Sequence, residues 1–296
     1  MAERDSLRSF LFEHFAVRGE IVHLDATWRE ALSRHHYPEP LRNLLGEMMA
    51  AAALLTGTLK FDGSLTIQLQ GGGPVTLGVV ECTSERHLRG LLRWEGDIAD
   101  GSLAALVGTG MMVITLEQRK TGERYQGVVD ISGNSLAQAL EHYLHSSEQL
   151  ETRLWLTADA NSASGMLLQR MPANEREAGE DDWPRVSQLA STITNEELLQ
   201  LDAETIVHRL FNEEDVRLFG PEPVAFRCSC SRERVENTLR MLGHEEVRSI
   251  IEEQGKVSVN CEFCNHHFEF DAVDVEGLFT TGFSDAVPGA SSRTRH

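Results

Sequence analysis

Two pairs of cysteines organise the C-terminal part of the chain, Cys228-Ser229-Cys230 and Cys261-Glu262-Phe263-Cys264. The two-residue gap of the second pair lets one tight turn direct both sulfurs at a single metal ion, and the one-residue gap of the first pair permits chelation with less freedom. Zn²⁺ favours four soft thiolates arranged as a tetrahedron. We therefore predict a closed zinc site whose ligands are Cys228, Cys230, Cys261 and Cys264, with no coordination position left for water or substrate.

Two alternatives apply to these cysteines. The first is a pair of structural disulfides, which a reducing compartment would disfavour. The second is replacement of a thiolate ligand by one of three nearby histidines, His244, His266 or His267. Because four sulfurs already complete a tetrahedral shell, we expect the histidines to be bystanders.

The residues between and after the cysteine pairs predict a compact module. Apolar residues at helical spacing predict a helix over residues 231–242, ended by Gly243, and a second short helix over residues 245–253. Alternating residues on either side of the second cysteine pair predict two strands that flank a metal-binding turn. The apolar core of such a module is small, so bound zinc, which contributes roughly 10–16 kcal/mol in zinc-finger peptides, should supply much of its folding free energy.

Length and charge narrow the class of protein. The chain has 296 residues, 41% of them hydrophobic, and a formal net charge of −19, which repels nucleic-acid phosphate and anionic lipid. No apolar segment follows the charged N-terminal residues, and the longest apolar run, residues 48–55, is too short to span a bilayer. We therefore predict a cytoplasmic protein that binds neither nucleic acid nor membrane, with thiols that stay reduced.

The first 172 residues combine two kinds of hydrophobic periodicity. Two strands are predicted over residues 6–24, and a long helix after Pro38 and Pro40, whose methionines belong to a buried core or, alternatively, to an adaptable binding face. From Ser64 the period changes to two, which predicts strands. No Gly-Lys-Ser/Thr follows Gly71-Gly72-Gly73-Pro74, so this run is a turn and not a phosphate-binding loop. Cys82 is expected to be a packed small residue. The mixture predicts an α+β domain.

Residues 173–227 differ in charge from what precedes them, with 13 acidic and 5 basic residues. Thr194-Asn195-Glu196-Glu197 forms a capping box that predicts one helix carrying Leu198, Leu201, Ile206, Leu210 and Phe211. A helix of this length needs a surface on which to bury its apolar stripe. The segment is either an ordinary docked helix or a metastable linker whose folding depends on the zinc module.

Several motifs together resemble one known family. They are C-x-C-S-x-E-R over residues 228–234, C-E-F-C over residues 261–264, Val17-Arg18-Gly19-Glu20-Ile21-Val22, and Gly165-Met166-Leu167-Leu168-Gln169. With these motifs the chain resembles the 33 kDa chaperonin, or heat shock protein 33, family over nearly its whole length. The resemblance favours the metastable linker and implies four segments. These are an N-terminal α+β client-binding core (residues 1–172), an acidic helical linker (residues 173–227), a zinc redox-switch domain (residues 228–282) and a disordered tail (residues 283–296).

The resemblance implies that the protein is a chaperone and not an enzyme. It implies an ATP-independent holdase that is inactive when reduced and zinc-bound, and that binds unfolding client proteins as a homodimer after oxidation. We expect oxidation to form the disulfides Cys228–Cys230 and Cys261–Cys264, as the resemblance also implies, with release of zinc and unfolding of the zinc domain and the linker.

Two rival functions remain. A thiol–disulfide oxidoreductase would use Cys261 and Cys264, but such enzymes place this motif at a helix start. A zinc-ribbon adaptor would bind a fixed partner irrespective of redox state. No nucleophile–base pattern or dinucleotide fingerprint occurs in residues 1–172.

Overall fold

A computed structural model of the chain describes residues 4–98, 101–131, 133–172 and 181–280. The chain folds as two compact units, Met1–Cys228 and Ser229–His296. Helices and strands are mixed in both units, which confirms the predicted α+β class. The finer division at residues 172, 227 and 282 stays a prediction, and the tail predicted to be disordered, residues 283–296, lies outside the described residues.

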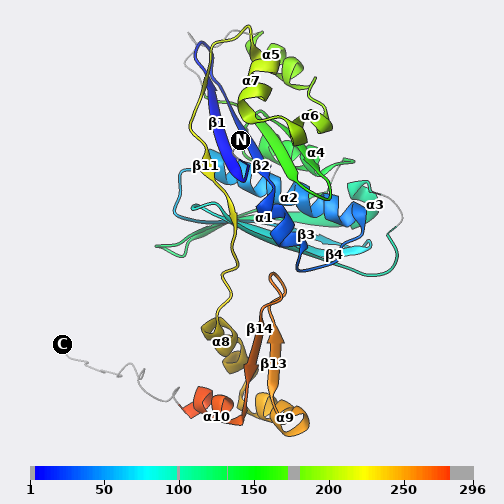
Figure 1. Cartoon of the computed structure of the whole chain (residues 1–296), viewed down its shortest axis with the longest axis vertical. Helices are drawn as coiled ribbons and strands as arrows, with labels where there is room; N and C mark the ends of the chain where they lie inside the picture. The colour runs from blue at the N-terminus through cyan, green and yellow to red at the C-terminus, as the bar shows by residue number, and fades with distance from the viewer. Residues whose placement is uncertain (1–3, 99–100, 132, 173–180, 281–296) are drawn as a thin grey trace, which may run out of the picture. The chain divides into compact units, whose positions relative to one another are not determined.

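The first unit contains two largely antiparallel sheets that form separate layers (Figure 1). Strand order in the first is β10-β1-β2-β9-β8, with β11 also paired to β1. Its strands are β1 (Ser6–Phe12), β2 (Val17–Leu24), β8 (Thr152–Ala158), β9 (Ala163–Arg170), β10 (Val216–Leu218) and β11 (Glu222–Pro223).

The second sheet has the order β12-β5-β4-β3-β6-β7 and is antiparallel except where β12 joins β5 in parallel. Its strands are β3 (Gly63–Gly71), β4 (Val75–Thr83), β5 (His87–Trp94), β6 (Gly110–Gln118), β7 (Arg124–Asp130) and β12 (Ala225–Phe226). The glycine run ends β3 and joins it to β4, so its prediction as a turn between strands is confirmed.

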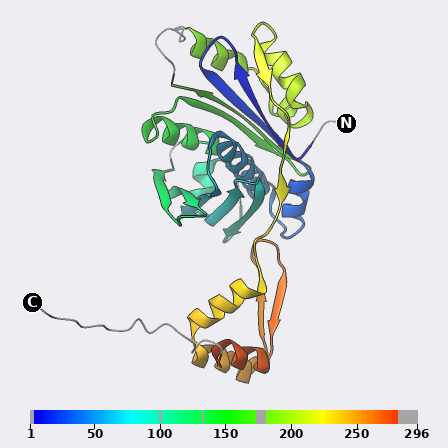
Figure 2. The same ribbon diagram turned by 90° about the vertical axis from the view of Figure 1, so that its left-hand side faces the viewer.

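Helix α2 (Glu39–Thr58) lies between the two sheets (Figures 1 and 2). It begins after Pro38, as predicted, and contacts strands of both sheets. Met48, Met49 and the four alanines that follow are fully buried. A helix that is apolar on all sides must be covered on all sides, so these methionines belong to the core and not to an adaptable surface.

Short helices complete the first unit. Helix α4 (Leu136–Ser146) packs beside β8, and α1 (Ala26–Leu32) and α3 (Leu103–Val107) lie at the ends of the sheets. Ser135 and Ser102 cap α4 and α3, since their side chains accept hydrogen bonds from backbone N–H groups of the first turn.

Three helices of the acidic segment cover the outer face of the first sheet (Figures 1 and 2). They are α5 (Asp182–Ala190), α6 (Asn195–Gln200) and α7 (Ala203–Phe211). Strand residues that point away from α2, among them Phe10, Ile21 and Met166, form one apolar cluster with Val186, Leu198, Ile206, Leu210 and Phe211 of these helices. These three helices, which belong to the predicted linker, therefore bury their apolar side chains on this sheet. We refer to this cluster as the linker–sheet core.

The single helix predicted after the capping box is wrong, although the box itself is confirmed. Thr194 and Glu197 make both reciprocal hydrogen bonds of the box. The chain then leaves the helical conformation at Leu201, with ψ at 150°, and Asp202 caps a new helix by accepting a hydrogen bond from the Thr205 N–H. Asp202 is a strong N-cap residue, so it starts a second helix where the apolar periodicity alone indicated continuation.

A buried carboxylate in the first sheet leads to a pH-dependent prediction. Glu20 on β2 is 3% exposed and accepts a hydrogen bond from the Ser9 hydroxyl at 2.9 Å. Burial raises the pKa of Glu20 to about 7, although that hydrogen bond and nearby Arg18 and Arg86 oppose the rise. Because the folded-state pKa exceeds the unfolded-state value, the free energy of unfolding falls as pH rises from the unfolded-state pKa to about 7.

We expect Glu20→Gln to raise the free energy of unfolding by up to about 3 kcal/mol at pH 8.5 and by little at pH 5, where the wild-type side chain is protonated in the folded state. Urea denaturation at both pH values measures the difference. Glu204→Gln on the exposed surface of α7 is the matched control and should change neither value. An equal gain at both pH values would contradict the assignment.

The second unit is built on a two-stranded ribbon. Strands β13 (Val257–Asn260) and β14 (His267–Phe270) pair antiparallel, and α8 (Arg232–Leu242), α9 (His244–Gln254) and α10 (Ala272–Thr280) pack with them. Gly243 at φ 94° and Gly255 at φ 76° end the two predicted helices, and such positive φ values favour glycine. The predicted strands on both sides of the cysteine turn are confirmed, whereas α10 was not predicted.

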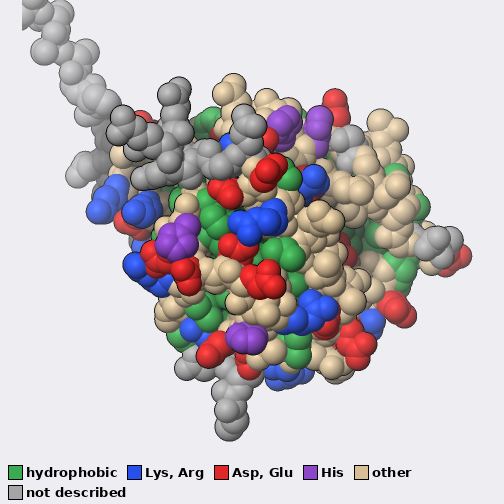
Figure 3. All heavy atoms as spheres, turned by 90° about the horizontal axis from the view of Figure 1, so that it is seen from above, with side chains coloured by type: hydrophobic (Ala, Val, Ile, Leu, Met, Phe, Trp, Pro, Cys, Tyr) green, Lys and Arg blue, Asp and Glu red, His purple; other side chains and the backbone are tan. Residues whose placement is uncertain are grey.

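One face of the molecule (Figure 3) mixes charges of both signs. Figure 3 shows acidic and basic side chains interspersed over one face, with hydrophobic side chains in small areas between them. Within the described residues, none of the helices is long and apolar enough to cross a membrane.

Candidate metal centre

The structure brings the four predicted ligands together. One sulfur atom from each of Cys228, Cys230, Cys261 and Cys264 lies within 4.8 Å of the others, and the sulfurs of Cys230 and Cys264 are 3.4 Å apart. A tetrahedral zinc site with metal–sulfur bonds of about 2.3 Å has sulfur–sulfur edges of about 3.8 Å. The four thiols therefore fit one zinc ion, and this group is the one cluster of three or more metal-ligating side chains among residues that the structure describes.

The first cysteine pair sits directly before a capped helix. The Ser231 hydroxyl accepts a hydrogen bond from the Arg234 N–H at 3.2 Å and starts α8. The Arg234 guanidinium donates to the Ser229 hydroxyl at 2.6 Å, which ties the residue between the two cysteines to the first turn of the helix. The chain between Cys228 and Cys230 is thus held by the start of α8.

The second pair occupies the turn of the ribbon. The Cys261 N–H donates to the carbonyl of His266 at 2.9 Å, and the Asn265 N–H donates to the carbonyl of Cys261 at 2.7 Å. Asn265 has φ 54°, a left-handed conformation that asparagine tolerates better than most residues. These bonds close a tight turn that presents both sulfurs on one side, as the two-residue spacing predicts.

The apolar core behind the cysteines is small. Within the described part of the chain it consists of seven buried residues, and Cys230 and Cys261 pack against it. The seven are Leu239, Val247, Val257, Phe268, Phe270, Val275 and Leu278. A core of this size supplies little folding free energy by itself, which fits a module stabilised by a metal.

A scan against family models identifies the chain. The model described as "Hsp33 protein" matches residues 5–271. The chain belongs to the Hsp33 family. A "33 kDa chaperonin" of Nitrosococcus oceani is 49% identical over 296 residues and covers 100% of both chains, and that of Methylobacillus flagellatus is 50% identical over 290 residues and covers 98% of both. The resemblance seen in the motifs is therefore confirmed.

A solved structure supports the fold of this Hsp33 chain. The crystal structure of the 33 kDa chaperonin (heat shock protein 33 homolog) from Thermotoga maritima has a TM-score of 0.81 and covers 95% of this chain and 100% of its own. At 22% sequence identity this likeness shows the α+β fold. The chain is thus a member of a chaperone family, and membership of such a family implies binding of client proteins.

The three histidines near the Hsp33 cysteines all contact other groups. His244 lies 3.4 Å from a carboxylate oxygen of Glu276, His266 packs its ring edge against Phe268, and His267 Nδ1 is 2.6 Å from the Asn260 side-chain oxygen. Their imidazoles are outside the sulfur cluster. These contacts favour the four-thiolate ligand set over one that includes histidine.

One residue beside the cysteine cluster, Arg89, could not be predicted from the sequence to lie there. The Arg89 guanidinium, on β5, donates to the Cys228 sulfur at 3.9 Å and pairs with Glu81 at 2.8 Å. A positive charge next to a sulfur favours the thiolate over the thiol. Arg89 is 139 residues from Cys228 in the sequence, so only the pairing of β12 with β5 shows that they are neighbours.

The remaining cysteine belongs to the core. Cys82 is fully buried, and burial raises the pKa of its thiol to about 12. A thiol in this state is a poor nucleophile. The prediction that Cys82 is a packed small residue is confirmed.

The location of Cys261 and Cys264 also bears on oxidoreductase chemistry. Both lie in the turn between β13 and β14 and not at the start of a helix. A helix N-terminus is one of the features that lower the pKa of the attacking cysteine in thioredoxin-like enzymes. This arrangement favours a structural metal site over a dithiol redox enzyme.

Proposed function

We propose that the protein is an ATP-independent holdase whose client binding is switched on by oxidation of the cysteine cluster. In the reduced form Cys228, Cys230, Cys261 and Cys264 bind zinc and keep the chaperone inactive. The observation that carries the proposal is the meeting of four thiols within 4.8 Å in a module with a small apolar core. Bound zinc holds the thiolates together and supplies folding free energy to residues 228–282.

The redox step uses the thiols and an oxidant such as hydrogen peroxide. A thiolate attacks the peroxide, the O–O bond breaks, the sulfur becomes a sulfenic acid, and the second oxygen leaves as water after protonation. A neighbouring thiol then displaces the sulfenic hydroxyl as a second water and forms the disulfide. For each disulfide, two thiols are oxidised and one peroxide is reduced to two waters. The expected products are Cys228–Cys230 and Cys261–Cys264, which leave no thiolate ligands.

Loss of the ligands removes the main stabilising contribution to residues 228–282, and the linker, residues 173–227, is joined to them directly at Cys228. Helices α5, α6 and α7 are held on the sheet chiefly by the apolar contacts of the linker–sheet core. Their release uncovers strand residues such as Phe10, Ile21 and Met166. Contiguous apolar surface of this kind binds unfolded chains.

Other parts of the proposal follow the family resemblance. The activated form is a homodimer that works in the cytoplasm on unfolded or partly folded clients, without nucleic acid or membrane as partners. The net charge of −19 supports solubility of an activated form that exposes apolar surface.

One light-scattering experiment tests the switch. A chemically unfolded client is diluted into buffer with reduced or peroxide-treated protein, while a chromophoric chelator reports zinc. We expect suppressed aggregation only after oxidation, together with release of one zinc per chain. Zinc release without suppression would favour the adaptor function, and turnover in an insulin-reduction assay would favour the oxidoreductase.

Mass mapping of the oxidised protein tests the disulfide assignment. We expect the Cys228–Cys230 and Cys261–Cys264 disulfides each to lie within a single peptide, which is then lighter by two hydrogens, with Cys82 unmodified because it is buried. The 3.4 Å between the Cys230 and Cys264 sulfurs makes a Cys230–Cys264 disulfide the specific competitor. If that cross-linked product dominates, the near-neighbour pairing is wrong.

A further inference from the structure

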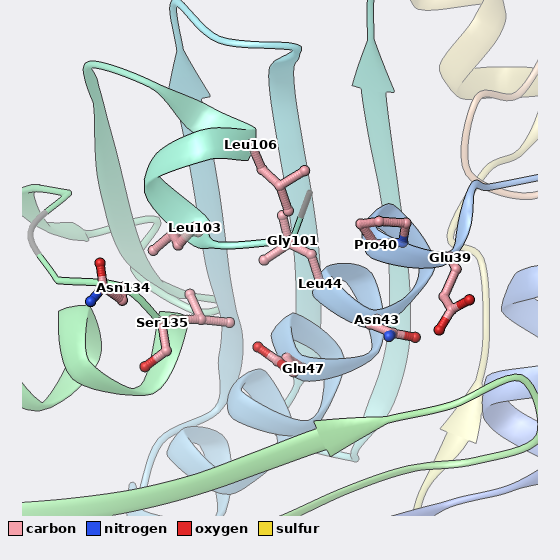
Figure 4. Close-up of a pocket in the computed structure, with 11 residues that line it drawn as sticks. Glu39, Pro40, Asn43, Leu44, Glu47, Gly101, Leu103, Leu106, Asn134 and Ser135 are labelled. Atoms are coloured by element: carbon pink, nitrogen blue, oxygen red, sulfur yellow. The ribbon is translucent and has the colours of Figure 1, made fainter. Parts of the chain in front are cut away.

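A cavity of about 360 Å³ opens beside the first half of α2 (Figure 4). The residues that line it are far in the sequence from the four clustered cysteines. It lies entirely within the first unit, between α2, α3 and the start of α4. Its apolar wall is formed by four leucines: Leu44, Leu103, Leu106 and Leu136. Its polar groups come from Asn43, Glu47, Asn134 and Ser135.

Glu47 contributes an unpaired carboxylate to this cavity. Its carboxylate makes no hydrogen bond or ion pair with any other residue in the described ranges, and burial raises its pKa to about 7. Figure 4 shows the carboxylate directed toward the side where Ser135 and Asn134 lie, whereas Glu39 points away from it. An unpaired carboxylate in a half-buried place is costly unless a cation joins it.

The charges around the cavity select a cation. Glu39 and Glu47 are the two charged residues among those that line it, and lysine, arginine and histidine are absent from the lining that the structure describes. A metal ion would need further ligands, but the cysteine cluster is the one described group with three or more ligands close together. The leucine wall instead fits methylene groups, which bury well against apolar surface.

We propose that this cavity binds the ammonium group of an aliphatic primary amine, with the alkyl chain along the leucines and the ammonium on Glu47. An ammonium carries three donors and no acceptor. The Glu47 carboxylate supplies acceptors, and the Ser135 hydroxyl oxygen is a further acceptor on the side of the cavity toward which that carboxylate is directed. The amine comes from a lysine side chain of a bound protein or from a free alkylamine. The inference does not depend on the redox switch.

Titration of the full-length, reduced, zinc-loaded protein with n-butylammonium, followed by NMR at pH 8, tests the proposal. We expect saturable binding that Glu47→Gln weakens at least tenfold, because glutamine keeps the shape and removes the charge. Glu204→Gln on α7 makes the same change of net charge away from the cavity and should leave the affinity as it is. Equal affinities of wild type and Glu47→Gln, or no saturable binding to wild type, would overturn the proposal.

The pH dependence gives a test that needs no variant. The titratable groups that line the cavity are Glu39 and Glu47, and Glu39 is exposed. Protonation of Glu47 should therefore abolish binding to wild type between pH 8 and pH 5.5, and binding that persists unchanged at pH 5.5 would contradict the proposal. A blocked lysine peptide, compared with its norleucine counterpart, separates the two sources of amine: binding of the lysine peptide assigns the site to protein ligands, and binding of n-butylammonium alone assigns it to small amines.

Discussion

Replacement of Cys261 with serine should lower zinc affinity by at least about a hundredfold and loosen the fold of residues 229–280. The Cys261 sulfur is one of four within 4.8 Å. Serine keeps the backbone N–H that donates to the carbonyl of His266 in the ribbon turn, so the substitution removes one metal ligand and leaves that hydrogen bond in place. Zinc binding to four ligands is worth roughly 10–16 kcal/mol, so the loss of one ligand costs about 3 kcal/mol or more, about a hundredfold in affinity. Competition with a chromophoric chelator measures the affinity, and hydrogen exchange of α9, β13 and β14 reports the loosening.

The control for this substitution is Cys82→Ala. Cys82 is buried in the core of the first unit and should leave zinc affinity and stoichiometry as in wild type. Zinc binding by Cys261→Ser with wild-type affinity would refute the four-thiolate site. Loss of zinc from Cys82→Ala would show instead that the integrity of the first unit determines metal binding.

Truncation of Phe211 to alanine should release the linker helices and give client binding without any oxidant. Phe211 is 2% exposed at the centre of the linker–sheet core, with its ring 5.0 Å from the Phe12 ring and 5.9 Å from the Phe10 ring. Removal of a buried phenylalanine side chain costs about 3–5 kcal/mol. Because α7 is held on the sheet by the apolar contacts that Phe211 shares with Ile206 and Leu210, we expect much of that loss to appear as local opening of α7.

The reduced, zinc-loaded variant should therefore suppress client aggregation under conditions in which reduced wild type does not. Hydrogen exchange should show protection lost in α5 to α7 but kept in α2. Phe211→Leu, which retains most of the apolar volume, should have a much smaller effect, and Glu204→Ala on the exposed side of α7 should have none. A Phe211→Ala protein that opens its linker yet stays inactive would separate linker release from client binding.

Local sequence was sufficient for most of the second unit, with α10 as the exception. The spacing of Cys228, Cys230, Cys261 and Cys264 predicted the metal site because a two-residue gap and a strand on each side restrict where the sulfurs can point. The glycines at 243 and 255 marked both helix ends because they adopt positive φ values. In these cases the determining contacts lie within a few residues of one another.

Two of the contacts that the sequence did not predict are long-range, whereas one wrongly predicted feature, the break at Leu201, is local. Nothing near Phe211 in the sequence indicates that it meets Phe10 and Phe12, about two hundred residues earlier. The break at Leu201 depends on Asp202 competing as a helix cap, which apolar periodicity does not detect. Arg89 reaches Cys228 only because β12 adds to β5.

The path of the chain just before Cys228 has a consequence for the order of unfolding. Strand β11 pairs with β1 at the edge of one sheet, and β12 pairs with β5 at the edge of the other, and each is only two residues long. A chain that loosens from Cys228 backwards would thus detach in small steps, first from β5 and then from β1. Each step leaves a row of unpaired backbone N–H and C=O groups, which can pair with any extended polypeptide regardless of its side chains. Recognition through the main chain would suit the proposed holdase, because it does not select clients by their side chains.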